Sequence, residues 1–251
     1  MEQSLPDPHE HSSLVRFRAF GNLSRSEAGA MVPMITEHRQ LKKGEYLQEE
    51  GEPGSRIYLL LQGWTASSMM TPDGRRQIVK VHLAGDLIGL PGLSVPEVPD
   101  TVIALTDIVY GQLDRRALGE LFRDNPRVAA MMFLISLEER LMLMDRLTLV
   151  GRRDTAGGSA GMLLQLHARM LRHDPTIGDT LHLPLTQADL ADMVGVTLVH
   201  INRTLMEFRT KQIMSWSRGK VVIHNKTALR EIAGLPERVT TRDHRWLPDA
   251  S

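Results

Sequence analysis

Residues 186–208, TQADLADMVGVTLVHINRTLMEF, have the pattern of two short helices joined by a tight turn. Thr186 with Asp189 three residues later forms the capping-box pattern, which predicts the start of the first helix. Gly195 supplies the backbone freedom that a tight turn needs. Thr197 then stands at the N-cap position of the second helix. This arrangement is typical of a helix-turn-helix.

Each predicted helix has an apolar side that would pack inward. These positions are Leu190, Ala191 and Val194 in the first helix, and Leu198, Ile201, Leu205 and Phe208 in the second. At roughly 100° per residue, the opposite face of the second helix, residues 197–209, centres on Arg203. Arginine is the commonest bidentate reader of guanine, so this face predicts base readout in a DNA major groove by Arg203, His200, Asn202 and Val199. The alternative is an ordinary helical hairpin with a solvated face, and the neighbouring segments decide between the two.

Length and charge indicate two domains of different character. The chain has 251 residues, 42% of them hydrophobic, and a formal net charge of zero. The charges are segregated, because residues 152–233 hold 11 Lys and Arg against 7 Asp and Glu, whereas residues 1–151 hold 16 against 20. Phosphate affinity is therefore expected in the half that contains the helix pair.

Several protein classes are excluded by absent features. The chain has no cysteine, which excludes disulfides, thiol catalysis and thiolate-held iron–sulfur clusters. It shows no apolar run near twenty residues and no signal-peptide pattern, so we expect a cytoplasmic protein without membrane association. No nucleophile elbow, phosphate-binding loop or dinucleotide fingerprint is present, so no catalytic residue is predicted. His9 and His11 lack the third ligand that a metal site needs, so no metal site is predicted either.

Upstream of residue 114, short apolar runs alternate with glycine-containing turns. The predicted strands are Leu41 to Leu47, Ile57 to Gln62, Trp64 to Met69, Gln77 to Leu83 and Thr101 to Leu113. Pro72-Asp73-Gly74 is a hairpin turn signal. Many short strands at this spacing predict a rolled antiparallel β domain. The preceding Phe17 to Glu37 has loosely helical spacing, with Leu23, Met31, Met34 and Ile35 as buried candidates.

The segments around the helix pair predict a winged domain. Leu181, Leu183 and Leu185 alternate as a short strand, and Ile213 to Trp216 and Lys220 to His224 flank Ser217-Arg218-Gly219 as a hairpin. Arg218 and Lys220 at the hairpin tip can reach phosphate, which positions a protein on DNA without specifying sequence. We assign Thr186 and Thr197 to the same backbone-contacting set.

The β domain resembles the cyclic-nucleotide-binding-type β-roll of the CRP/FNR family of bacterial transcription regulators. The matching residues are Lys43-Gly44-Glu45, Gly51, Tyr58-Leu59-Leu60-Leu61-Gln62-Gly63, Asp73-Gly74-Arg75 and Gly85-Asp86-Leu87-Ile88-Gly89. With the helix pair downstream, the resemblance covers nearly all of residues 14–233. It implies an α+β fold with an N-terminal antiparallel, jelly-roll-like β-roll, a long dimerisation helix and a C-terminal winged helix-turn-helix. It also implies a homodimer whose partners are double-stranded DNA and RNA polymerase.

Asn125-Pro126 opens a long helix with two apolar lines. One line is Leu134, Leu137, Leu141 and Met144, and the other is Val128, Ile135, Met142 and Leu149. A helix that is apolar on two sides needs two partners, which are either the β-roll and a twin helix or two surfaces of one monomer. The resemblance favours dimerisation along this helix, for which we take Leu134, Leu137, Leu141 and Met144. The residues alone leave open which line faces the partner.

Gly151 to Gly161 has the composition of a hinge, with four glycines in eleven residues, and marks the expected domain boundary. The predicted organisation is a β-roll domain at 1–125, the dimerisation helix at 126–150, the hinge at 151–161, the winged helix-turn-helix at 162–233 and a tail at 234–251.

The resemblance invites cyclic AMP as effector, and the residues argue against it. Nucleotide-binding members carry a glutamate for the ribose and then an Arg-Ser pair for the phosphate after the Gly-Asp pair. Leu90 occupies the glutamate position here, and residues 95–101 read VPEVPDT without arginine. Burying a phosphate beside Glu97 and Asp100 without a cation would be costly. We therefore expect an unidentified effector or none, with Gly85, Asp86, Leu87, Gly89 and Leu90 as the candidate pocket.

A haem sensor would need a ligand such as His82, which lies on the strand face opposite Val79, Val81 and Leu83. A single strand histidine is more often a surface or hydrogen-bonded residue than a haem ligand, so no cofactor is predicted. The expected function is that of a homodimeric regulator reading an inverted-repeat operator. The alternative from another class is a ligand-binding or scaffold module that has lost specific DNA binding.

Overall fold

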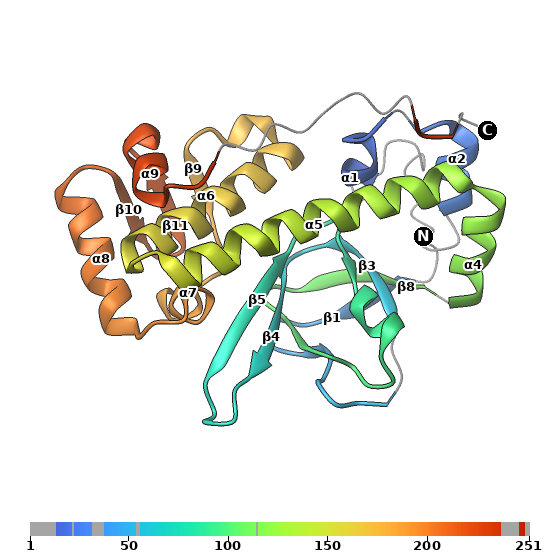
Figure 1. Ribbon diagram of the computed structural model, residues 1–251, viewed down its shortest axis with the longest axis horizontal. Coiled ribbons are helices and arrows are strands. Elements are labelled where there is room, and N and C mark those ends of the chain that lie inside the picture. Colours follow the sequence, from blue (N-terminus) through green and yellow to red (C-terminus); the bar gives the residue numbers. More distant parts are fainter. Residues whose placement is uncertain are drawn as a thin grey trace, which may run out of the picture. The chain divides into compact units, whose positions relative to one another are not determined.

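The protein is represented by a computed structural model that describes residues 14–21, 23–31, 38–53, 56–113, 115–236 and 246–248 (Figure 1). Its contacts divide the chain into two compact units. The β-roll unit comprises residues 1–69, 81–138 and 240–251, and the C-terminal unit comprises residues 70–80 and 139–239. His9, His11, Met34 and Ile35 lie outside the described residues.

Two antiparallel sheets form the predicted β-roll. One has the order β1 (His38–Leu41), β8 (Ile108–Leu113), β3 (Ile57–Gln62) and β6 (Leu87–Ile88). The other has the order β2 (Tyr46–Gln48), β7 (Thr101–Ala104), β4 (Thr65–Met70) and β5 (Arg76–His82). The core between them draws on both sheets and contains Leu47, Tyr58, Leu60, Ile88, Val102, Ala104, Ile108 and Tyr110. Here Tyr58 and Tyr110 meet edge to face, with ring centroids 5.5 Å apart.

The outer face of β3 packs against helices. Because successive side chains of a strand point to opposite faces, Ile57, Leu59 and Leu61 turn away from Tyr58 and Leu60. They join a second core formed with α1 (Val15–Arg18), α2 (Arg25–Met31), α4 (Arg115–Asp124) and the first half of α5 (Pro126–Arg152). Leu23 and Met31 are buried in this core, as predicted.

Two predicted strands are wrong in extent. The segment expected as one strand from Leu41 to Leu47 turns at Gly44, which has φ +89°, and the Lys42 N–H donates to the Glu45 carboxylate. Residues 101–113 form β7 and β8 rather than one strand. The interruption lies at Asp107, whose carboxylate accepts hydrogen bonds from the Lys42 ammonium and the Lys43 N–H. Because these corners are held by polar contacts, the hydrophobic pattern of the sequence gives no sign of them. The predicted turn at Pro72-Asp73-Gly74 does connect β4 and β5.

The two apolar lines of α5 differ in their exposure to solvent. Val128, Ile135 and Leu149 are at most 1% exposed, and Met142 is partly buried, so this line packs within the chain. Leu134 is also partly buried. Further along the other line the side chains open to solvent, with 37% exposure for Leu137, 43% for Leu141 and 53% for Met144. Among the described residues, no helix combines the length and apolar character required to cross a bilayer.

The hinge predicted at residues 151–161 is wrong over most of its length. Helix α5 continues to Arg152, and Asp154 caps α6 (Thr155–His173) by accepting a hydrogen bond from the Gly157 N–H. Gly158 and Gly161 are buried in α6. A Cβ on Gly158 would lie 2.8 Å from Val194 Cγ1, and one on Gly161 would lie 2.7 Å from Leu149 Cδ1. These glycines therefore allow close packing of α6 and are not hinge residues.

The remainder of the C-terminal unit follows α6 in chain order. Its elements are η4 (Pro175–Ile177), β9 (Thr180–His182), α7 (Gln187–Val194), α8 (Leu198–Thr210), β10 (Met214–Ser217), β11 (Lys220–Ile223) and α9 (Lys226–Ala233). The strands form a three-stranded antiparallel sheet of order β10-β11-β9. The short strand predicted through Leu181, Leu183 and Leu185 is confirmed only at its start, because β9 ends at His182, although all three leucines are buried.

The C-terminal tail contributes to the core of the β-roll unit. Leu247 is 6% exposed and belongs to the helix-covered core with Phe17 and Met131. Arg127 Nη1 donates a 2.8 Å hydrogen bond to the Pro248 carbonyl. The sequence carries no visible signal for this contact, because one leucine in a polar tail has no periodicity.

Candidate nucleic-acid interface

The helix-turn-helix is formed as the sequence predicts. The Thr186 hydroxyl accepts a hydrogen bond from the Asp189 N–H, and the Asp189 carboxylate accepts one from the Thr186 N–H at 2.8 Å. This capping box satisfies N–H groups at the start of α7 that have no partner within the helix. Gly195 ends α7 in the left-handed region at φ +77°. Buried side chains anchor α7, namely Leu190, Ala191 and Val194 as expected, together with Met193.

The reading face of α8 is open to solvent. The side chain of Arg203 is 76% exposed, and Val199 and Met206 are 75% and 71% exposed. His200 and Asn202 are also exposed. Arg203 Nε lies 3.9 Å from the carboxylate of Glu207, one helical turn away, and a pair this exposed is weak, so the guanidinium can turn outward at little cost. All four predicted base-reading side chains thus lie on one accessible surface.

Two details of α8 differ from the prediction. Leu198 is 44% exposed instead of buried, and Thr204 completes the inner face with Ile201, Leu205 and Phe208. The reason is that Leu198 is the first residue of α8, ahead of the turn that packs against the unit. Thr197 does occupy the N-cap position, but its hydroxyl contacts His200 Nδ1 at 3.2 Å instead of capping the backbone.

The wing consists of β10 and β11. Ser217 pairs with Lys220 across a two-residue turn, and both central residues have positive φ, +47° for Arg218 and +76° for Gly219. Such turns match the twist of a hairpin but disfavour a non-glycine residue at the first position. The strained Arg218 is exposed, as is Lys220, so the hairpin presents two cations at its tip.

One residue beside this surface was missed by sequence reasoning. Arg76 of β5 donates to Asp189 Oδ1 at 2.6 Å and to Asp192 Oδ2 at 2.8 Å, so it contacts two turns of α7. Burial lowers the pKa of Arg76, but the hydrogen bonds to Asp192 and Asp189 outweigh that effect and raise the pKa above its usual value. Gln77 adds a hydrogen bond from its side-chain amide to the Met193 carbonyl. No local pattern links positions more than a hundred residues apart.

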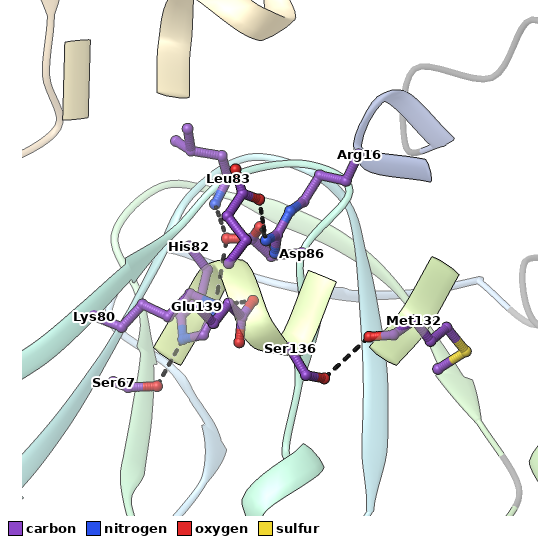
Figure 2. A network of polar contacts seen from close by, with 10 residues as sticks. Arg16, Ser67, Lys80, His82, Leu83, Asp86, Met132, Ser136 and Glu139 are labelled. Carbon is purple, nitrogen blue, oxygen red and sulfur yellow. Dashed lines mark hydrogen bonds and ion pairs between the residues drawn. The ribbon is translucent and has the colours of Figure 1, made fainter. Parts of the chain in front are cut away.

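The predicted effector residues lie in a tightly bonded turn of the β-roll unit. Asp86 is fully buried, and its carboxylate accepts hydrogen bonds from Arg16 at 2.9 Å and from the Leu83 N–H at 3.1 Å (Figure 2). Arg16 also reaches Glu138 of α5 at 3.0 Å. Gly85 and Leu87 are buried beside Asp86, and the Gly85 N–H donates to Leu60. The Asp86 carboxylate is therefore engaged by the protein itself.

His82 and the segment after Asp86 also make close contacts within the protein. His82 is 4% exposed, and its Nε2 lies 2.7 Å from the Ser67 hydroxyl (Figure 2). Gly89 has φ +84°, and a Cβ there would collide with the Arg56 carbonyl, so this glycine is required by backbone packing. Leu90 begins the 3-10 helix η3 (Leu90–Ser94) and is partly buried.

Comparison with known proteins identifies both parts of the chain. The family model described as "Cyclic nucleotide-binding domain" matches residues 38–125, and the "Crp-like helix-turn-helix domain" model matches residues 160–232. The chain belongs to the CRP/FNR family of transcription regulators. This CRP/FNR-family chain is 24% identical over 213 residues to the fumarate and nitrate reduction regulatory protein of Vibrio cholerae, covering 85% of each chain.

Other relatives agree with this assignment. The transcriptional activatory protein AadR of Rhodopseudomonas palustris is 25% identical over 181 residues, which cover 72% of this chain and 74% of AadR. The solved structure of FixK2 from Bradyrhizobium japonicum superposes with a TM-score of 0.71 at 25% identity, covering 80% of this chain and 98% of FixK2. These CRP/FNR-family relatives are regulators and not enzymes.

Proposed function

We propose that the protein acts as a homodimer that reads an inverted-repeat DNA operator through α8 of each copy. The observation that supports this most directly is the exposed face of α8, where Arg203, His200, Asn202 and Val199 lie together. Arg203 would donate to a guanine, and Val199 would pack near a thymine methyl group. Many family relatives have a glutamate at the Val199 position, which accepts from cytosine. Valine lacks that acceptor, so the familiar family half-site should change at that base pair.

Contacts to the DNA backbone would come from the two helix starts and the wing. Thr186 and Thr197 are exposed at the N-termini of α7 and α8, where backbone N–H groups favour phosphate. Arg218 and Lys220 would reach phosphate from the hairpin tip. These four residues position the protein and carry no base preference. The excess of cations in residues 152–233 supports the same role.

The exposed line of α5 supports dimerisation. Leu137, Leu141 and Met144 repeat with the spacing of a coiled-coil seam and are all at least 37% exposed in the single chain. A second copy of α5 packed in parallel would bury them. Two recognition helices would then face successive major grooves, about one DNA turn apart. A cytoplasmic location and a contact with RNA polymerase are part of this proposal.

No known effector class is assigned to the β-roll. Leu90 and the arginine-free segment 95–101 argue against cyclic nucleotides, and the lack of cysteine argues against an iron–sulfur cluster. The engagement of His82 by Ser67 argues against a haem ligand at that position. The protein is therefore proposed to respond to another effector, or to act without one.

Selection of bound sequences from random duplex DNA, using purified protein without added ligand, tests the proposal. We expect enrichment of an inverted repeat whose half-sites are centred about 10–10.5 base pairs apart or a multiple of that spacing. Size-exclusion chromatography with light scattering should report a dimer, and Leu141→Glu should shift it to monomer. Binding without any enriched repeat would instead support a ligand or scaffold module that has lost specific recognition.

A further inference from the structure

The hairpin of β4 and β5 supplies a cation to the acidic first helix of the helix-turn-helix. Helix α7 carries two carboxylates, Asp189 and Asp192, and no lysine or arginine. Arg76 of β5 donates to both, from Nη2 to Asp189 at 2.6 Å and from Nε to Asp192 at 2.8 Å. Residues 70–80, which contain the hairpin, belong to the same compact unit as α7. Arg76 and the two aspartates therefore form one ion cluster within the C-terminal unit.

This ion cluster lies beside the proposed phosphate contact at the start of α7. The hydroxyl of Thr186 is 2.8 Å from Asp189 Oδ2, and Arg76 binds Oδ1 of the same carboxylate. Thr186 itself is exposed. A DNA phosphate that reaches Thr186 would therefore come close to the negative charge of Asp189, and two charges of the same sign repel each other. The cation on the other side of the carboxylate opposes that repulsion.

Partial burial makes the charge of this cluster matter more. The side chains of Asp189 and Asp192 are 12% and 30% exposed, so water screens their charges only in part. One guanidinium against two carboxylates gives the cluster a net charge of −1, and without Arg76 that charge would be −2. Removal of Arg76 would thus double the negative charge next to the start of α7.

The next residue of the hairpin contacts the other end of α7. The side-chain amide of Gln77 donates a 3.1 Å hydrogen bond to the Met193 carbonyl, which lies in the last turn, where carbonyl groups have no partner within the helix. The Gln77 oxygen would also lie 3.3 Å from a Cβ on Gly195, the residue that ends α7. Two successive hairpin residues thus hold both ends of α7, which fixes the direction of the helix.

We propose that Arg76 is a positioning residue for DNA binding, which offsets the negative charge of α7 and holds Thr186 where it can meet a phosphate. This inference rests on the proposed DNA-binding function. Arg76 lies within residues 38–125, matched by the cyclic nucleotide-binding domain model, and outside residues 160–232, matched by the helix-turn-helix model. A residue of the β-roll sequence therefore contributes to the DNA-binding surface. Its contribution is independent of base sequence, because it acts on a backbone contact.

The affinity of the full-length protein for a random-sequence duplex, measured by fluorescence anisotropy over a series of salt concentrations, tests this role. We expect Arg76→Met to weaken binding about tenfold at low salt, and the loss should shrink as salt screens the added negative charge. Arg75→Met removes an 81% exposed arginine that pairs with Asp73 in the same hairpin, and it should leave the affinity within about twofold. Stoichiometric titration gives the active fraction of each variant, so incomplete folding does not affect the comparison.

A second substitution separates charge compensation from a direct phosphate contact. Asp192→Asn, added to Arg76→Met, removes one of the two carboxylates that have lost their cation, so the affinity should return to within about threefold of the native value. No recovery would mean that Arg76 binds phosphate itself, and a loss that is equal at all salt concentrations would mean a purely structural role. Either result would overturn the proposal, as would native affinity in Arg76→Met.

The same titrations distinguish this proposal from the DNA-binding function on which it rests. A native protein that binds no duplex would contradict both. Native binding that Arg76→Met leaves unchanged would contradict only the role of Arg76.

Discussion

Asp189 and Arg76 form an ion pair of 2.6 Å, although they stand 113 residues apart in the chain. The same Asp189 carboxylate closes the capping box of α7, and Asp192 accepts a second hydrogen bond from Arg76. Arg76→Met should therefore lower the free energy of unfolding by about 1 kcal/mol, the upper end for partly exposed pairs. Chemical denaturation measures this loss. Arg75→Met, which removes an 81% exposed arginine from the same hairpin, should change stability by less than about 0.5 kcal/mol. Equal losses would mean that the contact of Arg76 with α7 adds nothing.

Gly161 lies against Leu149, which is fully buried and cannot move aside freely. Gly161→Ala should thus destabilise the protein by about 1–3 kcal/mol, despite the better helix propensity of alanine. Gly119 offers a matched control, because it lies inside α4 with nothing within 4 Å of a built Cβ. Gly119→Ala should stabilise by about 0.5–1 kcal/mol. If both substitutions stabilised the protein equally in thermal unfolding, α6 would not pack closely on Leu149.

These glycines show why a hinge was predicted where a helix exists. In a single sequence, Gly157, Gly158 and Gly161 read as flexibility, since glycine lowers helix propensity. The actual role of Gly158 and Gly161 depends on Val194 and Leu149, which approach from α7 and α5. By contrast, Thr186 and Asp189 cap their own helix. Local chemistry of that kind is readable from sequence, whereas packing between distant elements is not.

The corner at Asp107 gives a pH-dependent prediction. A hydrogen bond from Lys42, followed by one from the Lys43 N–H, lowers the pKa of Asp107 below its usual 3.8. Because the folded-state pKa is the lower one, this group stabilises the fold above pH 3.8, and the contribution is lost as pH falls through the folded-state pKa. NMR titration of the carboxyl carbon should show the lowered pKa. Lys42→Met should raise the pKa of Asp107 part of the way back to its usual value. The pKa of Asp73, which pairs with Arg75, should stay unchanged.

The tail contact predicts that a residue outside both matched family domains affects stability. Leu247→Ala should lower the unfolding free energy by about 2 kcal/mol, because it removes a buried side chain from the helix-covered core. Trp246→Ala, at a neighbouring position that is 59% exposed, should cost little. The cysteine-free chain allows a direct check by thiol labelling. Leu247→Cys should react much more slowly than Trp246→Cys, and equal rates would contradict docking of the tail.

The outward side of α8 could be predicted from the sequence more reliably than the contacts around it. Helical periodicity alone identifies Arg203 and Val199 as outward, and both are at least 75% exposed. The same periodicity failed at Leu198, where a helix end lacks the packing of its interior. The engagement of Asp86 by Arg16 could not be anticipated, since an ion pair across 70 residues depends on the folded β-roll.

The most direct test of the central claim compares DNA affinity of the native protein and Arg203→Ala on the selected operator and on single-base variants of it. The account predicts that Arg203→Ala weakens operator binding by about 1–3 kcal/mol per half-site and loses discrimination at one base pair of each half-site. Lys220→Ala should weaken binding to all sequences alike, as expected for a phosphate contact. Equal losses for Arg203→Ala on operator and random DNA would contradict base readout by α8.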